Sequence, residues 1–500
     1  MLKLTYRMPY NTLTAAPPQD TTTKTPPKIG FVSLGCPKNL VDSEVMMGLL
    51  TRAGAELTPR AEDADILVVN TCSFIESAQQ ESVNAILEMA KHKTNGKAQK
   101  LIVAGCLVER YRNEIRQNIP EVDAVVGTGE LENILAAAGI APPPRVATTS
   151  PFTILTSRAE GDARAAQGRF DRKEWDGAVA DLPNYLYDED TPRVLTTPSY
   201  TAYIKIAEGC DHPCTFCIIP QLRGQFRSRR FESVIAEAER LVACGVRELT
   251  LIGQDTTCYG EDLGLKDGLP LLLERLAAIP DVRWVRFLYA YPNKITTRLL
   301  EAIGGHEKIC SYMDVPLQHA APAVLKSMRR GGGADIFLKS IAKMRRIVPD
   351  IALRTTFIVG FPGETEKDFE QLCEFVTEAK FDWLGAFGYS DQEGAQAHKL
   401  ESQLPAREVE HRRKKLMQIQ RQISKRKKKS MIGREFDLLL EGPSEESDLL
   451  WQGRTAMHAP EIDGTVLIND APDTIKLEAG AFHRCRITDA HDYDMVASII

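Results

Sequence analysis

The sequence predicts an α/β protein of three domains: a doubly wound parallel sheet, a partial barrel of six βα units, and a small antiparallel β-barrel. From residue 28 to about 395, short runs rich in Val and Ile alternate with segments of helical period, which is the pattern of parallel strands covered by helices. The alternation lapses only between 141 and 198. After residue 431, short strands and turns follow one another without helices, as in small barrels. A chain of 500 residues is also too long for one core.

The first domain is predicted over residues 28–140. Four strand-like runs are each followed by a helical segment, which indicates parallel strands with helices on both faces. The four runs are KIGFVSLG at 28–35, DILVVN at 65–70, KLIVAG at 100–105 and DAVVGT at 123–128. Residues 1–27 are rich in Thr and Pro and lack the apolar core of a signal peptide, so we expect a disordered extension there.

The second domain is predicted over residues 199–430. It follows a segment at 141–198 that mixes Pro, Ala, Gly and charge without a period and that we expect to be a linker or insertion. Six strand-like runs alternate with helices, as in an open barrel whose active face lies at the C-terminal strand ends. The domain ends in a long basic helix at 407–429, and the third domain, the small barrel, is predicted over 431–500.

The composition is that of a globular protein with reduced cysteines. Hydrophobic residues make up 43% of the chain, charged residues 26%, and the formal charge is −6, so no overall basic excess points to nucleic acid. The sequence contains no run of about 18 apolar residues, which is the length needed to span a membrane. Eleven cysteines, an odd number in so long a chain, favour free thiols or metal ligands in a cytoplasmic protein over a disulfide framework.

Cys210, Cys214 and Cys217 form a close group just after the first strand of the second domain, where barrel enzymes place their chemistry. A metal site made only of cysteine normally uses four thiolates, so one ligand is missing. A zinc site would need His212 as its fourth ligand, although its place beside Pro213 inside the loop suits the same metal poorly.

The interpretation that we favour is an iron–sulfur cubane with one iron left without a protein ligand. That iron can bind the amino and carboxylate groups of S-adenosylmethionine, which the cluster then cleaves by donating an electron. The spacing CxxxCxxC, with the aromatic Phe216 before the last cysteine, is typical of this chemistry.

Four further residues are candidates for binding S-adenosylmethionine because they follow later strands of the second domain. Gln254 lies in LIGQDTTCYG, and Gln318 lies in VPLQHAAP. Gly360 and Gly363 form a turn that permits close backbone approach to a ligand. A tight strand–helix turn is the alternative explanation for the two glycines.

Cys36, Cys72 and Cys106 form a second group despite spacings of 36 and 34 residues. Each follows a predicted parallel strand, and the C-terminal ends of such strands meet at one edge of the sheet. Three unrelated small residues in loops are the alternative, which the scarcity of cysteine disfavours. As in the first group of cysteines, three ligands would leave one iron of a cluster without a protein ligand.

The other five cysteines carry weaker signals. Cys244 and Cys373 lie in helical patterns and are expected in the core, since free cysteine packs as a small hydrophobe. Cys258, Cys310 and Cys485 have no partner that the sequence identifies.

Two groups of three cysteines, a six-unit barrel that begins with CxxxCxxC and a C-terminal β-barrel together resemble the methylthiotransferase family of radical-SAM enzymes. The resemblance covers residues 28–140 and 198–500 and implies an N-terminal methylthiotransferase domain, a radical-SAM core and a TRAM barrel. It also implies two 4Fe–4S clusters. The auxiliary cluster, which carries the sulfur to be transferred, would use Cys36, Cys72 and Cys106, and the radical-generating cluster would use Cys210, Cys214 and Cys217.

Within this family, two segments resemble the branch that modifies an aspartate of small-subunit ribosomal protein S-twelve. They are SLGCPKNLVDSE at 33–44 and KIAEGCDHPCTFCIIPQLRGQFRSR at 205–229, whereas tRNA-modifying relatives usually carry GCQMN around the first cysteine. The resemblance implies sulfur insertion at the aspartate β-carbon and S-methylation, using two S-adenosylmethionines. It also implies an electron donor such as flavodoxin or ferredoxin; the sulfur donor is not indicated.

Charge offers a separate test of the substrate. Residues 434–500 contain fourteen acidic and five basic side chains, a net charge of −9. Phosphate recognition depends on Lys and Arg, so this barrel suits a basic partner such as a ribosomal protein better than tRNA; an ordinary acidic surface is the alternative. The helix 407–429 carries eleven Lys or Arg and two Glu, and it either contacts ribosomal RNA or is a solvated helix face.

Two other functions therefore stay open at the level of sequence. One is a tRNA adenosine methylthiotransferase on the same scaffold, which would differ in the molecule that is modified. The other is a non-catalytic, metal-stabilised RNA-binding module, which would contain zinc in place of two cubanes.

Overall fold

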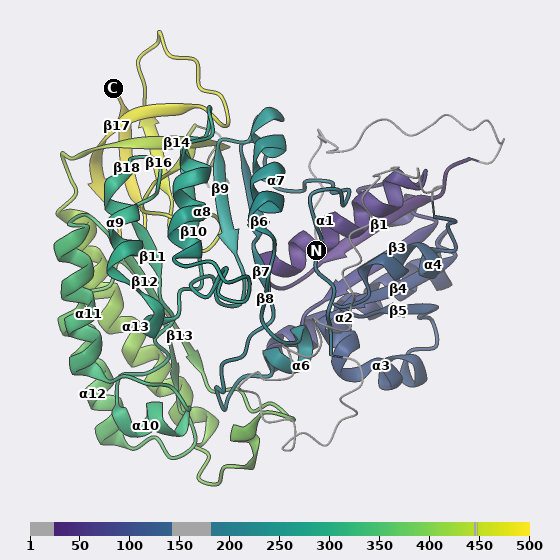
Figure 1. Cartoon of the computed structure of the whole chain (residues 1–500), viewed down its shortest axis with the longest axis horizontal. Coiled ribbons are helices and arrows are strands. Elements are labelled where there is room, and N and C mark those ends of the chain that lie inside the picture. Colours follow the sequence, from purple (N-terminus) through teal and green to yellow (C-terminus); the bar gives the residue numbers. More distant parts are fainter. Residues whose placement is uncertain (1–24, 143–181, 445–446, 448) are drawn as a thin grey trace.

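The N-terminal domain is built on a five-stranded parallel sheet, coloured purple to blue in Figure 1. The computed structural model describes residues 25–142 and 182–500, apart from 445, 446 and 448, so most of the predicted extension and linker lies outside the described residues. The strands lie in the order β2-β1-β3-β4-β5, with bounds β1 (Lys28–Ser33), β2 (Glu56–Leu57), β3 (Ile66–Thr71), β4 (Lys100–Gly105) and β5 (Ala124–Val126). The four expected strands are present, and β2 is an additional edge strand paired with β1.

Helices cover both faces of this sheet because every second side chain of a strand points to the same face. Ile66 and Val68 pack with α1 (Pro37–Arg52) and α4 (Ile134–Ala138), whereas Leu67 and Val69 pack with α2 (Glu76–Thr94) and α3 (Cys106–Asn118). All six side chains of β3 are buried. The doubly wound arrangement predicted from the sequence is therefore confirmed.

The second domain is a partial barrel of six parallel strands. Three form the sheet β10-β9-β6, three form the sheet β11-β12-β13, and a parallel bridge between Val285 and Ile309 links the two halves. The strands are β6 (Thr201–Lys205), β9 (Glu248–Ile252), β10 (Trp284–Phe287), β11 (Tyr312–Asp314), β12 (Ala352–Val359) and β13 (Trp383–Gly388). The helices are α7 (Phe231–Ala243), α8 (Gly268–Ala277), α9 (Thr297–Gly305), α11 (Ala334–Ile347), α12 (Glu366–Ala379) and α13 (Ala406–Lys429).

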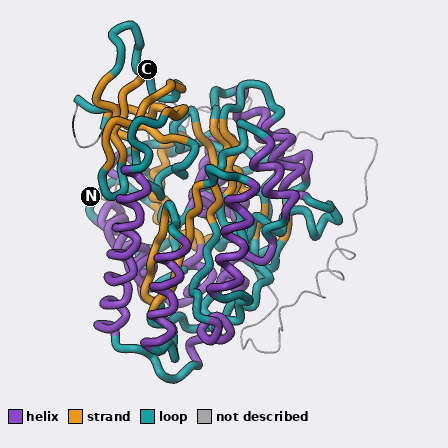
Figure 2. Tube along the Cα trace, turned by 90° about the vertical axis from the view of Figure 1, so that its left-hand side faces the viewer, coloured by secondary structure: helices purple, strands orange, loops and turns teal. Residues whose placement is uncertain are grey.

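Short elements complete the loops of the barrel. They are the antiparallel pair β7 (Ala207–Glu208) and β8 (Arg227–Ser228), and the helices α6 (Ile219–Arg223) and α10 (Pro322–Ser327). Figure 2 shows the helices outside the strands of this domain and the C-terminal strands gathered at one end of the molecule. None of the helices in the described part of the chain is long and apolar enough to cross a membrane.

One face of the basic helix α13 packs against the barrel. Leu416, Gln420 and Ile423 are buried on one face of it, and the Gln420 side chain donates to the Phe381 carbonyl. Arg412 is also buried and pairs with Glu364 at 2.6 Å. One face of the helix is therefore structural, and the remaining Lys and Arg residues lie mostly on the opposite, exposed face.

The C-terminal domain is a closed barrel in the order β14-β15-β16-β18-β17. Its strands are β14 (Glu435–Pro443), β15 (Trp451–Thr455), β16 (Val466–Asp470), β17 (Phe482–Ala490) and β18 (Met495–Ile499). The neighbours are antiparallel except for β16 and β18, which are parallel. The predicted barrel is present, and the parallel pair follows from its size, because five strands cannot alternate in direction all the way round a closed ring.

The small barrel docks on the N-terminal ends of the core strands. Arg454 of β15 and Arg286 of β10 both donate to Glu248, the first residue of β9, with the shortest contact at 2.7 Å. All three side chains are buried. Burial alone would raise the pKa of Glu248, but Arg454 and Arg286 outweigh it and lower the pKa to about 2.

Because Glu248 is charged and buried against two arginines, the stability of the docked barrel should depend on acid pH. Because the pKa of Glu248 is depressed when folded, its contribution, about 3 kcal/mol, is present above about pH 4.5 and is lost as the pH falls toward 2. Glu248→Gln should lower the urea midpoint strongly at pH 7, since two arginines lose their charged partner. The difference in urea midpoint between Glu248→Gln and wild type should become smaller as the pH falls from 4.5 to 3. Tryptophan fluorescence reports the unfolding. A constant difference over that range would contradict the assignment.

Residues 182–198, the end of the segment predicted as a linker, form a brace between the first two domains. Arg193 is 2% exposed and donates to Glu44 of α1 at 2.6 Å and to Glu237 of α7 at 2.7 Å. The Thr196 hydroxyl donates to the other Glu44 oxygen at 2.8 Å. Gly48 allows α1 to approach this segment, since a Cβ there would lie 2.3 Å from the Pro192 carbonyl oxygen. The described end of the segment is thus part of the folded core.

Candidate active site

Cys36, Cys72 and Cys106, called the first triad below, lie at one edge of the N-terminal sheet. Cys36 directly precedes α1, Cys72 directly follows β3, and Cys106 begins α3 after β4. Because β1, β3 and β4 are parallel neighbours, their C-terminal ends meet at this edge. Gly35 has a positive φ of 89° and lies so close that a Cβ on it would stand 3.0 Å from the Cys72 sulfur. The structure therefore brings together the loops that carry these cysteines.

The electrostatics show that the three sulfurs of the first triad lie near one another. Burial raises the pKa of Cys72 and raises that of Cys106 to about 12. The Cys36 sulfur contributes to both increases. Cys36 directly precedes α1 and Cys106 begins α3, so both lie where the helix dipole favours negative charge. This edge is suited to holding anionic ligands once a metal neutralises their repulsion.

Cys210, Cys214 and Cys217, called the second triad below, lie in the loop between β7 and α6. The loop is tightened by a hydrogen bond from the Cys217 N–H to the Cys214 carbonyl at 3.2 Å. Arg330 donates to the Cys214 sulfur at 3.5 Å, and the Ile219 N–H donates to the Cys217 sulfur at 3.5 Å. Burial, with the neighbouring Cys214, raises the pKa of Cys217 to about 12.

The spacing of the sulfurs distinguishes a cluster from a single ion. Tetrahedral zinc, with Zn–S bonds of 2.3 Å, holds its sulfurs about 3.8 Å apart. Among the described residues, only His212, Asp255 and Cys258 bring three possible ligand atoms within 4.8 Å of one another, and neither triad does so. Each thiolate of a 4Fe–4S cluster binds a different iron, which requires wider spacing. Neither triad therefore has the close sulfur spacing of a single zinc ion, and the wider spacing that a cubane requires is compatible with both.

His212 is used elsewhere than as a fourth ligand of the second triad. Its Nε2 lies 2.6 Å from Asp255 Oδ2, and its ring stacks on Tyr291 with centroids 3.7 Å apart. Cys258, which had no partner in the sequence, donates its S–H to the same Asp255 oxygen at 3.1 Å. The zinc alternative therefore lacks its fourth ligand.

Two tyrosines after β10 connect the triads. Burial raises the pKa of Tyr289, and the Cys36 sulfur raises it further. Burial also raises the pKa of Tyr291, to which the Cys214 and Cys210 sulfurs contribute. Lys38, two residues after Cys36, lies over the Tyr289 ring, and Arg330, which donates to Cys214, lies over the Tyr291 ring. Both triads therefore lie near this short loop.

A buried charge cluster joins the two domains beside this loop. Arg223 of α6 and Lys205 of β6 both donate to Asp42 of α1, each at 2.5 Å. Glu208 accepts from Lys205 at 2.5 Å and from Arg223 at 3.4 Å. Burial works to lower the pKa of Arg223, but Cys106 and Asp42 outweigh it and hold it well above its usual value. A positive charge of the core thus faces the first triad.

The remaining predicted residues all lie near the C-terminal ends of core strands, in different surroundings. Gln254 donates to Glu208 at 2.5 Å, and its carbonyl oxygen is buried without a hydrogen-bond partner in the described structure. Gln318 has a strained positive φ of 72°. Phe216 packs in a small apolar cluster with Met328 and Phe361.

The two predicted glycines both adopt positive φ, 75° at Gly360 and 82° at Gly363. A Cβ at Gly360 would lie 2.4 Å from Val409 of α13. The close approach at Gly360 is thus to a protein side chain, which explains this glycine without a ligand. A Cβ at Gly363 would meet nothing within 4 Å, so its positive φ is the reason for glycine there.

Sequence reasoning missed three residues that lie beside the triads: Lys38, Arg223 and Tyr289. The first two are inside segments quoted above for their resemblance, CPKN and LRG, and the third is in FLYAYP after a predicted strand. The sequence signal that could have identified them is a charged or aromatic residue close to a cysteine or to the end of a strand. What the sequence could not show is that Lys38 of the first domain lies beside Arg223 and Tyr289 of the second.

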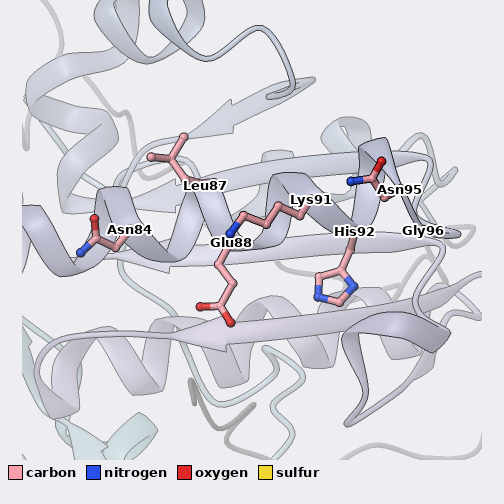
Figure 3. Close-up of a pocket in the computed structure, with 7 residues that line it drawn as sticks. All are labelled: Asn84, Leu87, Glu88, Lys91, His92, Asn95 and Gly96. Carbon is pink, nitrogen blue, oxygen red and sulfur yellow. The ribbon is translucent and has the colours of Figure 1, made fainter.

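A surface hollow of about 670 Å³ lies along α2 (Figure 3). Its lining comes from one face of the C-terminal half of that helix and the following turn, between Asn84 and Gly96. Because α2 starts at the cysteine edge and runs back along the sheet, this hollow lies toward the opposite edge. It is therefore separate from the candidate site.

Three stretches of the chain match known families. Residues 28–127 match the Uncharacterized protein family UPF0004, residues 204–376 match the Radical SAM superfamily, and residues 432–500 match the TRAM domain. These stretches contain both triads and most of the three domains described above.

Two full-length relatives are similar to the chain throughout. It is 70% identical over 488 residues to the ribosomal protein uS12 methylthiotransferase RimO of Koribacter versatilis (strain Ellin345), covering 95% of this chain and 97% of that protein. It is 54% identical over 475 residues to RimO of Solibacter usitatus (strain Ellin6076), covering 95% of each. Among solved structures, the radical S-adenosylmethionine methyltransferase TsrM from Kitasatospora setae is 14% identical, with a TM-score of 0.49, covering 73% of this chain and 72% of that one.

Proposed function

The chain belongs to the RimO family of methylthiotransferases, and we propose that it transfers a methylthio group to the β-carbon of an aspartate in ribosomal protein uS12, the S-twelve protein above. It is a radical-SAM enzyme with iron–sulfur and S-adenosylmethionine as its cofactors. The observation that carries the proposal is the convergence of two cysteine triads near the loop that holds Tyr289 and Tyr291. Lys38, beside the first triad, and Arg330, beside the second, each lie over one of these rings. Two separate clusters are the simplest use of two such sets.

The two clusters, when bound, supply the electron that cleaves S-adenosylmethionine and the sulfur that is transferred. The second triad would hold its cluster beside Arg330, whose guanidinium donates to the Cys214 sulfur and lies 4.6 Å from the centroid of the Tyr291 ring. Arg223 brings positive charge to the first triad, which lowers the cost of burying anionic sulfur. Arg223 also pairs with Asp42 of α1, which links the core to the domain that carries the first triad.

Two observations support a protein substrate. Eight relatives that span 43% to 70% identity carry the name uS12 methylthiotransferase. The barrel carries a net charge of −9, which disfavours phosphate and favours a basic partner. We further propose that the enzyme acts in the cytoplasm with an electron donor such as flavodoxin or ferredoxin.

A substrate competition tests the proposal. The anaerobically reconstituted enzyme, given S-adenosylmethionine, reductant, purified uS12 and bulk tRNA together, should add one methylthio group to uS12 and none to tRNA. Peptide mass spectrometry locates the modified aspartate, and nucleoside analysis covers the tRNA. Methylthio-adenosine with unmodified uS12 would establish the tRNA enzyme instead. Zinc in place of iron and sulfide, with neither product, would leave the non-catalytic module.

A further inference from the structure

The reaction requires that a carboxylate be held next to the carbon that is attacked. An aspartate β-carbon carries its carboxylate directly, so a site that takes the carbon from water takes the charge as well. Burying an unpaired carboxylate is costly, and the cost falls when a buried cation receives it. On the proposed function, therefore, a cation without a partner should lie close to the first triad.

Lys38 has this placement. It lies two residues after Cys36 in the first turn of α1, and it is 8% exposed. Its ammonium lies 3.3 Å from the centroid of the Tyr289 ring. Within the described residues no carboxylate forms a salt bridge with it, whereas the nearby Arg223 and Lys205 are both paired. Lys38 is thus a buried cation without a carboxylate partner in the described structure. Burial works to lower its pKa, and the Tyr289 hydroxyl and the Cys36 sulfur raise it.

Beyond the Tyr289 hydroxyl and the Cys36 sulfur, the described part of the fold gives the charge of Lys38 little support. A cation in the first turn opposes the helix dipole, which favours negative charge there, and α1 has no acidic residue in that turn. The contact with the tyrosine ring offsets only about 2 kcal/mol. Lys428, the other buried lysine without a salt bridge, stacks 3.6 Å from Trp383 beside the C-terminal barrel. A ligand carboxylate would give Lys38 the carboxylate partner that it lacks.

Tyr289 is held in an unusual conformation beneath this ammonium. Its φ is +64°, which costs free energy for an aromatic residue. The strain is maintained by two bonds: the Tyr289 N–H donates to Asp314 at 3.0 Å, and its carbonyl accepts from the Thr256 N–H at 3.2 Å. Strained residues that the surroundings fix in this way are typical of ligand sites.

A buried polar group in the neighbouring charge cluster also lacks a hydrogen-bond partner. The Gln254 carbonyl oxygen is buried without a hydrogen bond in the described structure, and its amide donates to Glu208, which pairs with Arg223. Arg223 in turn acts electrostatically on Lys38. One free acceptor and one free cation in the same region suit an amino-acid substrate, which brings peptide N–H groups and a carboxylate.

We propose that Lys38 is the residue that binds the substrate aspartate, with its ammonium pairing with the β-carboxylate and thereby holding the β-carbon beside the first triad. The assignment rests on the proposed function. It makes Lys38 a determinant of specificity for aspartate over neutral side chains. It also gives Tyr289 the role of positioning the ammonium.

The test removes the charge of the substrate aspartate and the charge of Lys38 in separate experiments. Purified uS12 with the natural aspartate, and uS12 with asparagine at that position, are titrated into the reconstituted enzyme, and binding is followed by fluorescence anisotropy without reductant. Wild type should prefer the aspartate form by at least about 30-fold. Lys38→Met should abolish the preference, Lys38→Arg should retain part of it, and the exposed control Lys91→Met should leave it unchanged.

The outcomes separate this inference from the proposed function. A preference that persists in Lys38→Met, with wild type active on uS12, would overturn the assignment of Lys38 alone. The same holds if Lys38→Met leaves the preference intact and shifts only the reduction potential of the first-triad cluster, since Lys38 would then serve the cluster. Because the asparagine substrate needs no altered enzyme, equal binding of both forms by wild type would overturn it even if the variants fail to fold. A wild type that modifies tRNA and ignores uS12 would instead remove the proposed function.

Discussion

Cys36→Ala should abolish the formation of methylthio-aspartate while S-adenosylmethionine is still cleaved to 5′-deoxyadenosine. Cys36 belongs to the triad that we propose presents sulfur, and the radical cleavage depends on the other triad. Cys214→Ala should lose both activities, because the iron that binds S-adenosylmethionine is then not correctly held. Mass spectrometry of uS12 and chromatography of 5′-deoxyadenosine, on the same reactions, measure the two activities separately.

Iron content provides the control for these variants. Wild type should bind about eight iron atoms per chain, and each variant should retain about half. Cys373→Ala, partly buried in α12 and outside both triads, should keep the full content and both activities. Each variant must also be shown to be folded, since the stability of a metal-binding domain is coupled to its metal. If a folded Cys36→Ala with an intact second cluster still made product at the wild-type rate, the division of roles would be wrong.

Much of the fold could be predicted because its signals are local. The runs that became β1, β3 and β4 are continuous apolar segments that feed helices, and this pattern needs no knowledge of distant residues. The first triad could be predicted for the same reason. Cys36, Cys72 and Cys106 each follow such a run, and parallel topology then brings them to one edge.

What could not be predicted depends on residues far apart in the chain. Arg193 and Glu44 are 149 residues apart, and Lys205 and Asp42 are 163 apart. No period or spacing relates such pairs. The segment around Arg193 resembles a linker because it has no regular element of its own, yet its buried side chains Tyr187 and Val194 join the core between two domains. The pairing of Lys38 with Tyr289 belongs to the same class of contact.

Arg193→Met should destabilise the chain by about 3–5 kcal/mol, because it leaves the buried carboxylates of Glu44 and Glu237 without their cation. The loss should also reach the chemistry. Glu44 belongs to α1, which begins directly after Cys36, and Glu237 belongs to the barrel that carries the second triad. A weaker brace lets the two triads separate, so more 5′-deoxyadenosine should be released for each methylthio group formed.

The matched control is Arg230→Met. Arg230 pairs with Glu189 at 2.9 Å across the same segment, but its side chain is 69% exposed, so its loss should cost no more than about 1 kcal/mol. Adding Glu44→Gln to Arg193→Met should recover part of the lost stability, since one buried charge is removed. Urea unfolding measures both effects. Equal midpoints for Arg193→Met and Arg230→Met, with an unchanged ratio of 5′-deoxyadenosine to product, would show that the two domains are held in register by other contacts, of which the Asp42–Arg223 pair is the next to test.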